Sequence, residues 1–262
     1  MLDRVRGLVG TARMAGHAAL PIGVVRGLEA RRMFRARGLN DVTLRTAFEA
    51  WLARIHLLPA DIDLRNAAVV DIGANEGLFS AGFLGIAPNA RIVAVEPGPA
   101  PRERLRARIG GRPNVEILDA AVARASGSAT FNLTAHDHNS SLRAPLAGSQ
   151  EAIGGGWDVV EQVDVPTLSL DDLVGDREVD VLKIDVQGAE LDVLQGGQRA
   201  LTRTRAVLLE MNFFSQYDGD ATFDTLHAEM TRAGFELVNV SAPLTTPDGT
   251  AIFIDGCYAR RP

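Results

Sequence analysis

The sequence predicts an α/β fold in which helices cover both faces of a mainly parallel β-sheet. From residue 67 on, short apolar runs alternate with segments of helical spacing, which is typical of strands joined by crossover helices. The runs also lack polar alternation, as strands buried on both faces should. They are AVVDIG, RIVAVEP, NVEIL, VDVLKID, AVLLEM, FELVNV and AIFID. The chain has 262 residues and is 46% hydrophobic, so it can bury the core that such a sheet requires.

The part before the sheet is predicted to form a helical N-terminal extension over residues 1–60, and residues 61–262 the sheet domain. In the extension, apolar residues recur at helical spacing and a proline ends the run. They are Leu44, Phe48, Trp51, Leu52 and Ile55, followed by Pro59. We expect the extension to form a cap over the domain or an arm of a homodimer.

The charge of the chain is unevenly distributed. Residues 1–40 carry eight arginines against two acidic residues, whereas the whole chain has a formal net charge of −6. A basic arm can bind nucleic acid. This arm lacks the interleaved aromatic residues that stack on bases, and the rest of the chain is acidic. We therefore expect no nucleic-acid partner.

Residues from about 124 to 165 interrupt the alternation and are predicted to form a hairpin and loop insertion. They include FNLTAHDHNSSL and the run Gly154–Gly156. An insertion of this length inside a compact domain favours a functional role. His136 and His138 lie in it, and His138 is a candidate general base because the ordinary pKa of histidine is about 6.5.

Cysteine content and hydropathy indicate the compartment. Cys257 is the only cysteine, so the chain has no intramolecular disulfide, and we expect a cytoplasmic protein. No run of about 20 apolar residues occurs, so we expect no transmembrane segment.

A nucleotide site is predicted where the first strand ends, in VVDIGANEGLFS. Asp71, Gly73 and Gly77 mark a strand-to-helix turn at which the backbone can approach a ligand closely. Asn75 stands where a dinucleotide-binding turn has its second glycine, which disfavours a pyrophosphate. Glu96 ends the next strand at the spacing of an acid that accepts both ribose hydroxyls.

These features favour S-adenosylmethionine, an adenosyl cofactor without a pyrophosphate, whose cationic groups would lie near Asp71. Asp119 follows the third strand and is predicted to lie where the adenine amino group binds. The alternative for Asp119 is a solvated loop carboxylate.

The chain uses a single lysine, Lys183, in VLKIDVQGAE. Lys183 and Asp185 are two residues apart and share one face of a strand. Asp185 ends that strand, where an open α/β sheet presents its ligands. Lys183 either forms a structural ion pair or sets the charge state of a carboxylate beside the acceptor.

Five stretches resemble the FkbM family of S-adenosylmethionine-dependent methyltransferases. They are DIGANEGLFS, VAVEPGP, NSSL, VPTLSLDDL and LKIDVQGAELDVLQG, followed by LLEM. The resemblance implies a Rossmann-like class I methyltransferase fold, with a seven-stranded sheet whose last strand is antiparallel. It also implies O-methylation of a sugar, glycoside or polyketide-type molecule.

The chain departs from the family at Gln187, where the resemblance implies Glu. A carboxamide keeps the shape of that residue but cannot take a proton. Asp185, Glu190 or His138 could serve as the base instead, with Lys183 beside Asp185. We expect Glu to be tolerated at position 187, because it restores the family's residue at similar volume.

Three alternatives stay open at this point. A Mg²⁺ ion could be held by the oxygen ligands Asp185, Glu210 and Asn212 at adjacent strand ends. The protein could instead be a nucleic-acid methyltransferase that uses the Arg-rich arm. It could also be a non-catalytic nucleotide-binding module.

Overall fold

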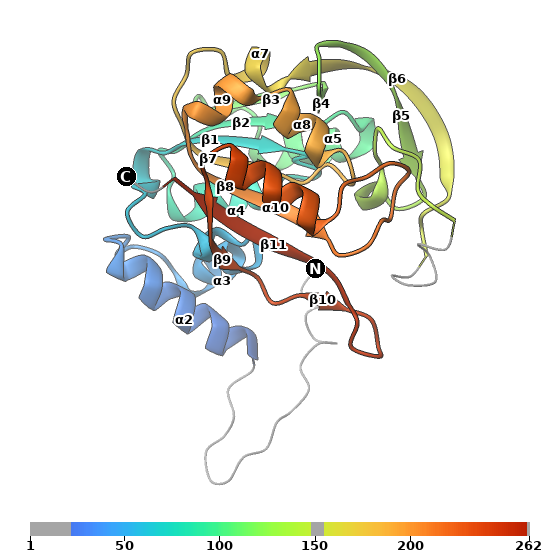
Figure 1. Ribbon diagram of the computed structural model, residues 1–262. Coiled ribbons are helices and arrows are strands. Elements are labelled where there is room, and N and C mark those ends of the chain that lie inside the picture. The colour runs from blue at the N-terminus through green and yellow to red at the C-terminus, as the bar shows by residue number, and fades with distance from the viewer. Residues whose placement is uncertain (1–21, 148–154, 261–262) are drawn as a thin grey trace.

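A computed structural model describes residues 22–147 and 155–260, and its architecture is the predicted α/β sheet (Figure 1). Five parallel strands form its centre, in the spatial order β3 (Val115–Leu118), β2 (Arg91–Val95), β1 (Ala68–Ile72), β7 (Val179–Ile184) and β8 (Thr204–Asn212). The last strand, β11 (Ala251–Ala259), pairs antiparallel with β8, and both β9 (Glu236–Val240) and β10 (Leu244–Thr245) pair with β11. The predicted fold class is confirmed, and the two-residue β10 makes the sheet eight-stranded instead of seven-stranded.

Helices cover both faces of the sheet because successive strand residues point to opposite sides. Val69, Val181 and Leu208 belong to one apolar core, and the residues that follow them in the chain belong to the other. The first core is covered by α2 (Ile22–Ala36), α3 (Leu44–Leu52), α4 (Leu78–Ile86) and α5 (Pro99–Ile109). The second is covered by α7 (Leu170–Val174), α8 (Glu190–Gln195), α9 (Gln198–Thr202) and α10 (Phe223–Arg232).

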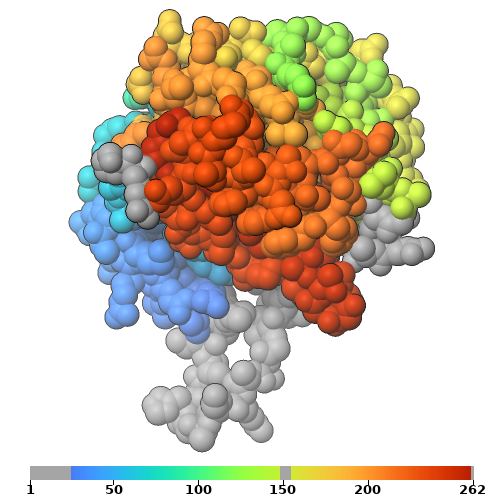
Figure 2. Space-filling model, in the orientation of Figure 1, coloured from blue at the N-terminus to red at the C-terminus, as the bar shows by residue number. Residues whose placement is uncertain are grey.

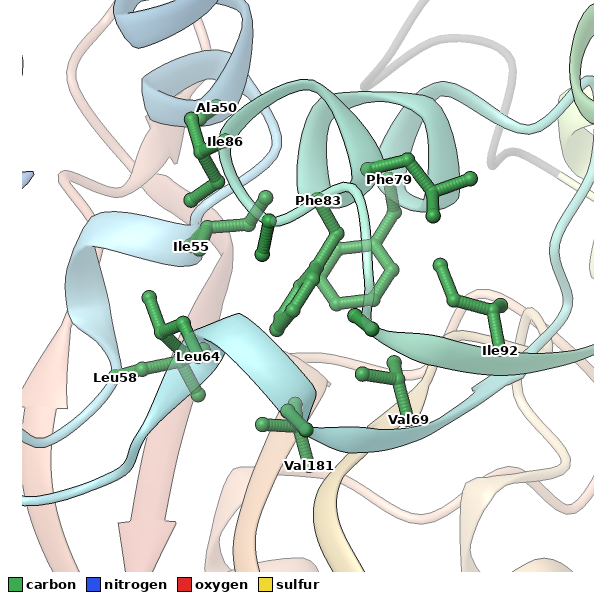
Figure 3. Packing of buried hydrophobic residues seen from close by; sticks show 14 of the residues in the cluster. Ala50, Ile55, Leu58, Leu64, Val69, Phe79, Phe83, Ile86, Ile92 and Val181 are labelled. Atoms are coloured by element: carbon green, nitrogen blue, oxygen red, sulfur yellow. The ribbon is translucent and has the colours of Figure 1, made fainter. Parts of the chain in front are cut away.

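The N-terminal helices share the core of the sheet domain. Phe34 of α2 is fully buried in the same cluster as Phe83 of α4 and Val181 of β7. Figure 3 shows Ala50 of α3 and Ile55 of the short helix η1 (Ile55–Leu57) beside α4, with Leu64 of η2 (Leu64–Asn66) nearby. In Figure 2 the surface of these helices adjoins that of the C-terminal strands. The apolar core therefore continues across residue 60, where the sequence pattern changes.

A second, smaller sheet contains the predicted insertion and extends beyond it by a few residues at both ends. It consists of β4 (Ala121–Ala123), β5 (Gly127–Thr134) and β6 (Val159–Ser169), in which β5 and β6 pair antiparallel. A short helix, η3 (Asp137–Asn139), follows β5 and carries His138. The first residue of the glycine run, Gly154, lies outside the described residues. Three of the eight arginines of residues 1–40 also lie outside them: Arg4, Arg6 and Arg13. Among the described residues, no helix is both long and apolar enough to cross a lipid bilayer.

Candidate active site

The turn after β1 lies against the end of β7. Gly73 has a φ of +70°, and a Cβ atom built on it would lie 1.8 Å from the backbone oxygen of Asp185. Only glycine fits such a close approach at positive φ. The amides of Gly73 and Ala74 both donate to the carbonyl of Val95, so the turn is also fixed to β2. The local sequence thus brings the ends of three parallel strands together.

Glu96 closes this turn with its carboxylate. Oε2 accepts from the amide of Asn75 at 2.7 Å, and Oε1 accepts from the amide of Gly98 at 2.7 Å. The side chain is only 6% exposed. Burial raises the pKa of Glu96 to about 7, although the two amide hydrogen bonds act in the opposite direction. Each carboxylate oxygen has a second lone pair that can accept from a ligand.

A cavity of about 300 Å³ opens beside Glu96. Its lining combines the ends of the central strands with the insertion sheet. Residues from both parts include Glu96, Ala120, Phe131, Trp157, Asp185 and Gln187. The cavity therefore combines the carboxylate of Glu96, apolar and aromatic side chains, and the polar side chains of Asp185 and Gln187.

Lys183 connects β1 and β7 behind this cavity. Its Nζ donates to the carbonyl of Gly73 at 2.7 Å and lies 3.3 Å from Oδ2 of Asp185 and 3.5 Å from Oδ1 of Asp71. Burial lowers the pKa of Lys183, but Asp185 and Asp71 outweigh this effect, so its pKa is above the ordinary value. Asp71 is fully buried and also accepts from the hydroxyl of Ser80 at 2.6 Å. The ion pair fixes the turn to the strand that carries Asp185.

Gln187 bridges two carboxylates at the cavity wall. Its Nε2 donates to Oδ1 of Asp185 at 2.8 Å and to Oε1 of Glu210 at 3.0 Å. Its Oε1 accepts from the hydroxyl of Tyr217 at 2.9 Å. Burial, with a further contribution from the Asp185 carboxylate, raises the pKa of Glu210 well above its ordinary value. These contacts use both amide protons and the amide oxygen, which fixes the orientation of the amide.

A second cavity, of about 280 Å³, meets the first at the strand ends. The residues that line both are Gly73, Asn75, His138, Asp185, Glu210 and Phe253. The far wall of the second cavity consists of Leu52, Ala53 and Arg54 from the N-terminal extension and Asp255 from β11. Asp185 and His138 therefore lie where the two cavities join.

Some predicted site residues line these cavities. They are Gly73, Asn75, Glu96, His138, Lys183, Asp185 and Glu210. Three other predicted site residues, Asp71, Gly77 and Glu190, are absent from the described lining of either cavity. Gly77 is the N-cap residue of α4 and has a φ of +82°. Glu190 accepts from the amides of Val186 at 3.0 Å and Gly188 at 3.2 Å. Gly77 and Glu190 thus shape the turns around the site.

Asp119 does not reach the cavity in this structure. Its carboxylate forms an ion pair with Arg102 of α5 and is about half exposed. The neighbouring Ala120 lines the cavity instead. The adenine contact predicted for Asp119 is therefore not supported by its position.

The predicted metal ligands Asp185, Glu210 and Asn212 do not come together as a ligand set. Oδ1 of Asn212 accepts from Nε2 of Gln216 at 2.7 Å, and the amide of Gln187 holds the other two side chains. Across residues 22–147 and 155–260, no group of three or more His, Cys, Asp or Glu side chains is arranged to hold a metal ion. The Mg²⁺ alternative has no support in the described residues.

Sequence reasoning missed several cavity residues. Phe131 and Trp157 lie within the predicted insertion, so their aromatic side chains were a signal that could have been used. Arg54 and Phe253 had no such signal, because 199 positions separate them and only the fold brings them to one cavity. Gln187 departs from the family pattern, but its bridging contacts with Asp185 and Glu210 have no signal in the sequence.

Comparison with known proteins places the chain in a family. The family profile described as the methyltransferase FkbM domain matches residues 71–237. The AMB antimetabolite synthetase AmbE of Pseudomonas aeruginosa is 33% identical over 241 residues, which cover 79% of this chain and 11% of that protein. The 2-O-methyltransferase NoeI of Sinorhizobium fredii is 30% identical over 161 residues, covering 58% and 65%. The 31-O-demethyl-FK506 methyltransferase FkbM of Streptomyces tacrolimicus is 26% identical over 214 residues, covering 72% and 78%.

This chain spans only part of the first two relatives, 11% of the length of AmbE and 65% of the length of NoeI. The profile itself covers well over half of this chain, including the glycine turn, Glu96 and the strand ends around Asp185. The chain belongs to the FkbM methyltransferase family.

Proposed function

We propose that the protein transfers a methyl group from S-adenosylmethionine to a hydroxyl group of a small acceptor of the sugar or polyketide type. The observation that carries this proposal is the position of Glu96. Its buried carboxylate accepts from the amide of Asn75 in the glycine turn. Glu96 and Asp185 both line the first cavity. A carboxylate in that position suits the two hydroxyls of an adenosyl ribose.

The residues around the first cavity fit this cofactor better than a dinucleotide. The amide of Asn75 already donates to Glu96, so this amide is not available to a pyrophosphate. Gly73 lines the cavity without a side chain, and Phe131 offers an apolar wall. S-adenosylmethionine, when bound, supplies a methyl group on a cationic sulfur that is a good leaving group.

Asp185 is the group that we assign to the acceptor hydroxyl. It lies at the junction of the two cavities, and Lys183 and Gln187 hold its two oxygens in fixed directions. A carboxylate held in this way orients the hydroxyl and accepts its proton as the new bond forms. His138 lines the same junction and is the alternative base.

Two relatives support a hydroxyl as the accepting group. NoeI is named as a 2-O-methyltransferase, and FkbM as a methyltransferase of 31-O-demethyl-FK506. Both names describe transfer to oxygen. A cytoplasmic location and a homodimer through the N-terminal helices stay predictions.

The proposal is tested with purified protein. Mass spectrometry of the protein should detect S-adenosylmethionine or S-adenosylhomocysteine that co-purifies with it. A screen of hydroxylated acceptors with methyl-labelled cofactor should then find transfer, which Asp185→Asn lowers by about 100-fold or more. If His138→Ala abolishes transfer while Asp185→Asn is near normal, the assignment of the base to Asp185 is wrong. Failure to bind either form of the cofactor would contradict the proposed function itself.

A further inference from the structure

We propose that the second cavity is the acceptor site, and that it selects an uncharged, hydroxyl-bearing molecule with an apolar portion. This inference rests on the proposed function, because it assigns the second cavity of the same active site. It concerns the class of acceptor, which neither the family nor the relatives' names determine for this chain.

The arrangement of the two cavities supports the assignment. Glu96 lines only the first cavity, whereas Asp185, Glu210 and His138 line both. A molecule in the second cavity can therefore present a hydroxyl to Asp185 without entering the space beside Glu96. The volume of about 280 Å³ is enough for a monosaccharide-sized group.

The charges in the second cavity disfavour an anionic acceptor. Among its described lining residues, four are acidic and two are cationic: Glu76, Asp185, Glu210 and Asp255 against Arg54 and Lys183. Both cations are already paired, since Nε of Arg54 lies 2.7 Å from Oδ2 of Asp255 and Lys183 pairs with Asp185. Glu76 is paired as well, with Arg104 at 3.6 Å and Arg108 at 3.5 Å. An anionic group would find no unpaired cation among these lining residues, while hydroxyls can donate to the carboxylates of Asp185 and Asp255.

The apolar part of the cavity indicates an apolar part of the acceptor. Leu52 of α3 is 44% exposed and Leu78 of α4 is 43% exposed, and both line this cavity. Phe253 of β11 adds a ring to the same lining. A bound molecule with an apolar portion would cover these side chains and remove their surface from water.

Arg54 holds the apolar wall in place as a positioning residue. It has a φ of +62°, and its guanidinium contacts both Asp255 of β11 and the carbonyl of Leu52, the latter at 3.1 Å. These contacts tie the end of α3 to the last strand of the sheet. The N-terminal extension thus contributes a fixed wall next to the site.

The test compares two probes that share one skeleton and differ only at C6, in the presence of saturating S-adenosylhomocysteine. Octyl β-D-glucopyranoside has hydroxyls and an apolar tail, and octyl β-D-glucopyranosiduronic acid carries a carboxylate in place of the C6 hydroxymethyl group. We expect calorimetry, below the critical micelle concentration, to show binding of the neutral probe at least about tenfold tighter than that of the anionic probe.

Two matched variants locate the binding site on the protein. Leu52→Gln should weaken binding of the neutral probe by roughly tenfold, because it removes an apolar contact. Leu28→Gln changes a leucine of similar exposure, 46%, that is absent from the described cavity lining, so probe binding should stay unchanged. Both variants should bind S-adenosylhomocysteine as the unmodified protein does.

Three results would overturn this inference. They are no binding of the neutral probe, equal binding of the two probes, and equal loss of binding in the two leucine variants. Each is meaningful only when S-adenosylhomocysteine binds normally. Loss of that binding would count against the proposed function instead, so the two failures are distinguishable.

Discussion

The two sides of the active site are built differently. On the Glu96 side, backbone amides of Asn75 and Gly98 hold the carboxylate, and these residues lie within two short stretches of the chain. On the Asp185 side, the groups are side chains from several distant segments, such as His138, Glu210 and Phe253. The comparison shows that a site made of local turns has a sequence pattern, whereas a site made of side chains from many segments has little.

The largest expected effect comes from removing the residue that joins the two sides. Lys183→Met leaves Asp71, which is fully buried, without its cationic partner. We expect the free energy of unfolding to fall by about 3–5 kcal/mol, because an uncompensated buried carboxylate is costly. Urea unfolding measures the loss.

The matched control is the double variant Lys183→Met, Asp71→Asn. It also neutralises the carboxylate, so it should recover part of the lost free energy of unfolding. A loss below about 1 kcal/mol in Lys183→Met would mean that the ion pair does not hold the two sides together.

The second-largest expected effect is a dependence of stability on pH, caused by one buried glutamate on each side of the active site. Burial raises the pKa of both Glu96 and Glu190 to about 7, whereas an unfolded Glu titrates near 4.5. Between these two pH values the native protein binds more protons than the unfolded chain. The free energy of unfolding therefore falls by about 3 kcal/mol per group as pH rises from about 4.5 to about 7. Above pH 7 these two groups cause no further change.

Unfolding free energies measured across this pH range, without cofactor, test the prediction. Glu96→Gln and Glu190→Gln should each make the slope shallower, because each removes one titrating group. An unchanged slope in both variants would show that neither carboxyl holds its proton in the folded protein.

The smallest of these effects concerns Gln187, for which the structure reverses the expectation drawn from the family pattern. The amide donates to both Asp185 and Glu210, and an ionised Glu in its place could donate to neither. We expect Gln187→Glu to lower the free energy of unfolding by about 1–3 kcal/mol at pH 8. The loss should shrink toward pH 5, where the new carboxyl keeps its proton.

Gln187→Met separates charge from lost hydrogen bonds. It removes the bridge without adding a carboxylate, so its loss of stability should not depend on pH in the same way. If Gln187→Glu is as stable as the unmodified protein at pH 8, the bridging amide is not required.

The same contrast explains what could be predicted from the sequence. The mainly parallel sheet was predictable because apolar runs and turn residues are local signals. Its antiparallel last strand was implied by the family resemblance and not by these runs. The place of Glu96 beside the glycine turn was predictable because one helix and one strand separate it from Gly77, and its carboxylate accepts from Asn75 of that turn. A sequence pattern does not reveal the ion pair between Asp119 and Arg102, and the adenine contact of Asp119 stays a prediction. Arg54 of the second cavity was not predictable, since a contact with Asp255 across 201 positions is a property of the fold.

The central claim is that the Glu96 side binds the cofactor and the Asp185 side acts on the acceptor. Calorimetric titration of S-adenosylhomocysteine into Glu96→Ala and Asp185→Asn tests it most directly. Glu96→Ala should weaken binding by about 1.5–3 kcal/mol, because a charged hydrogen-bonding group is lost, while Asp185→Asn should keep the affinity within about twofold. Unchanged affinity in Glu96→Ala, or a larger loss in Asp185→Asn than in Glu96→Ala, would contradict the account.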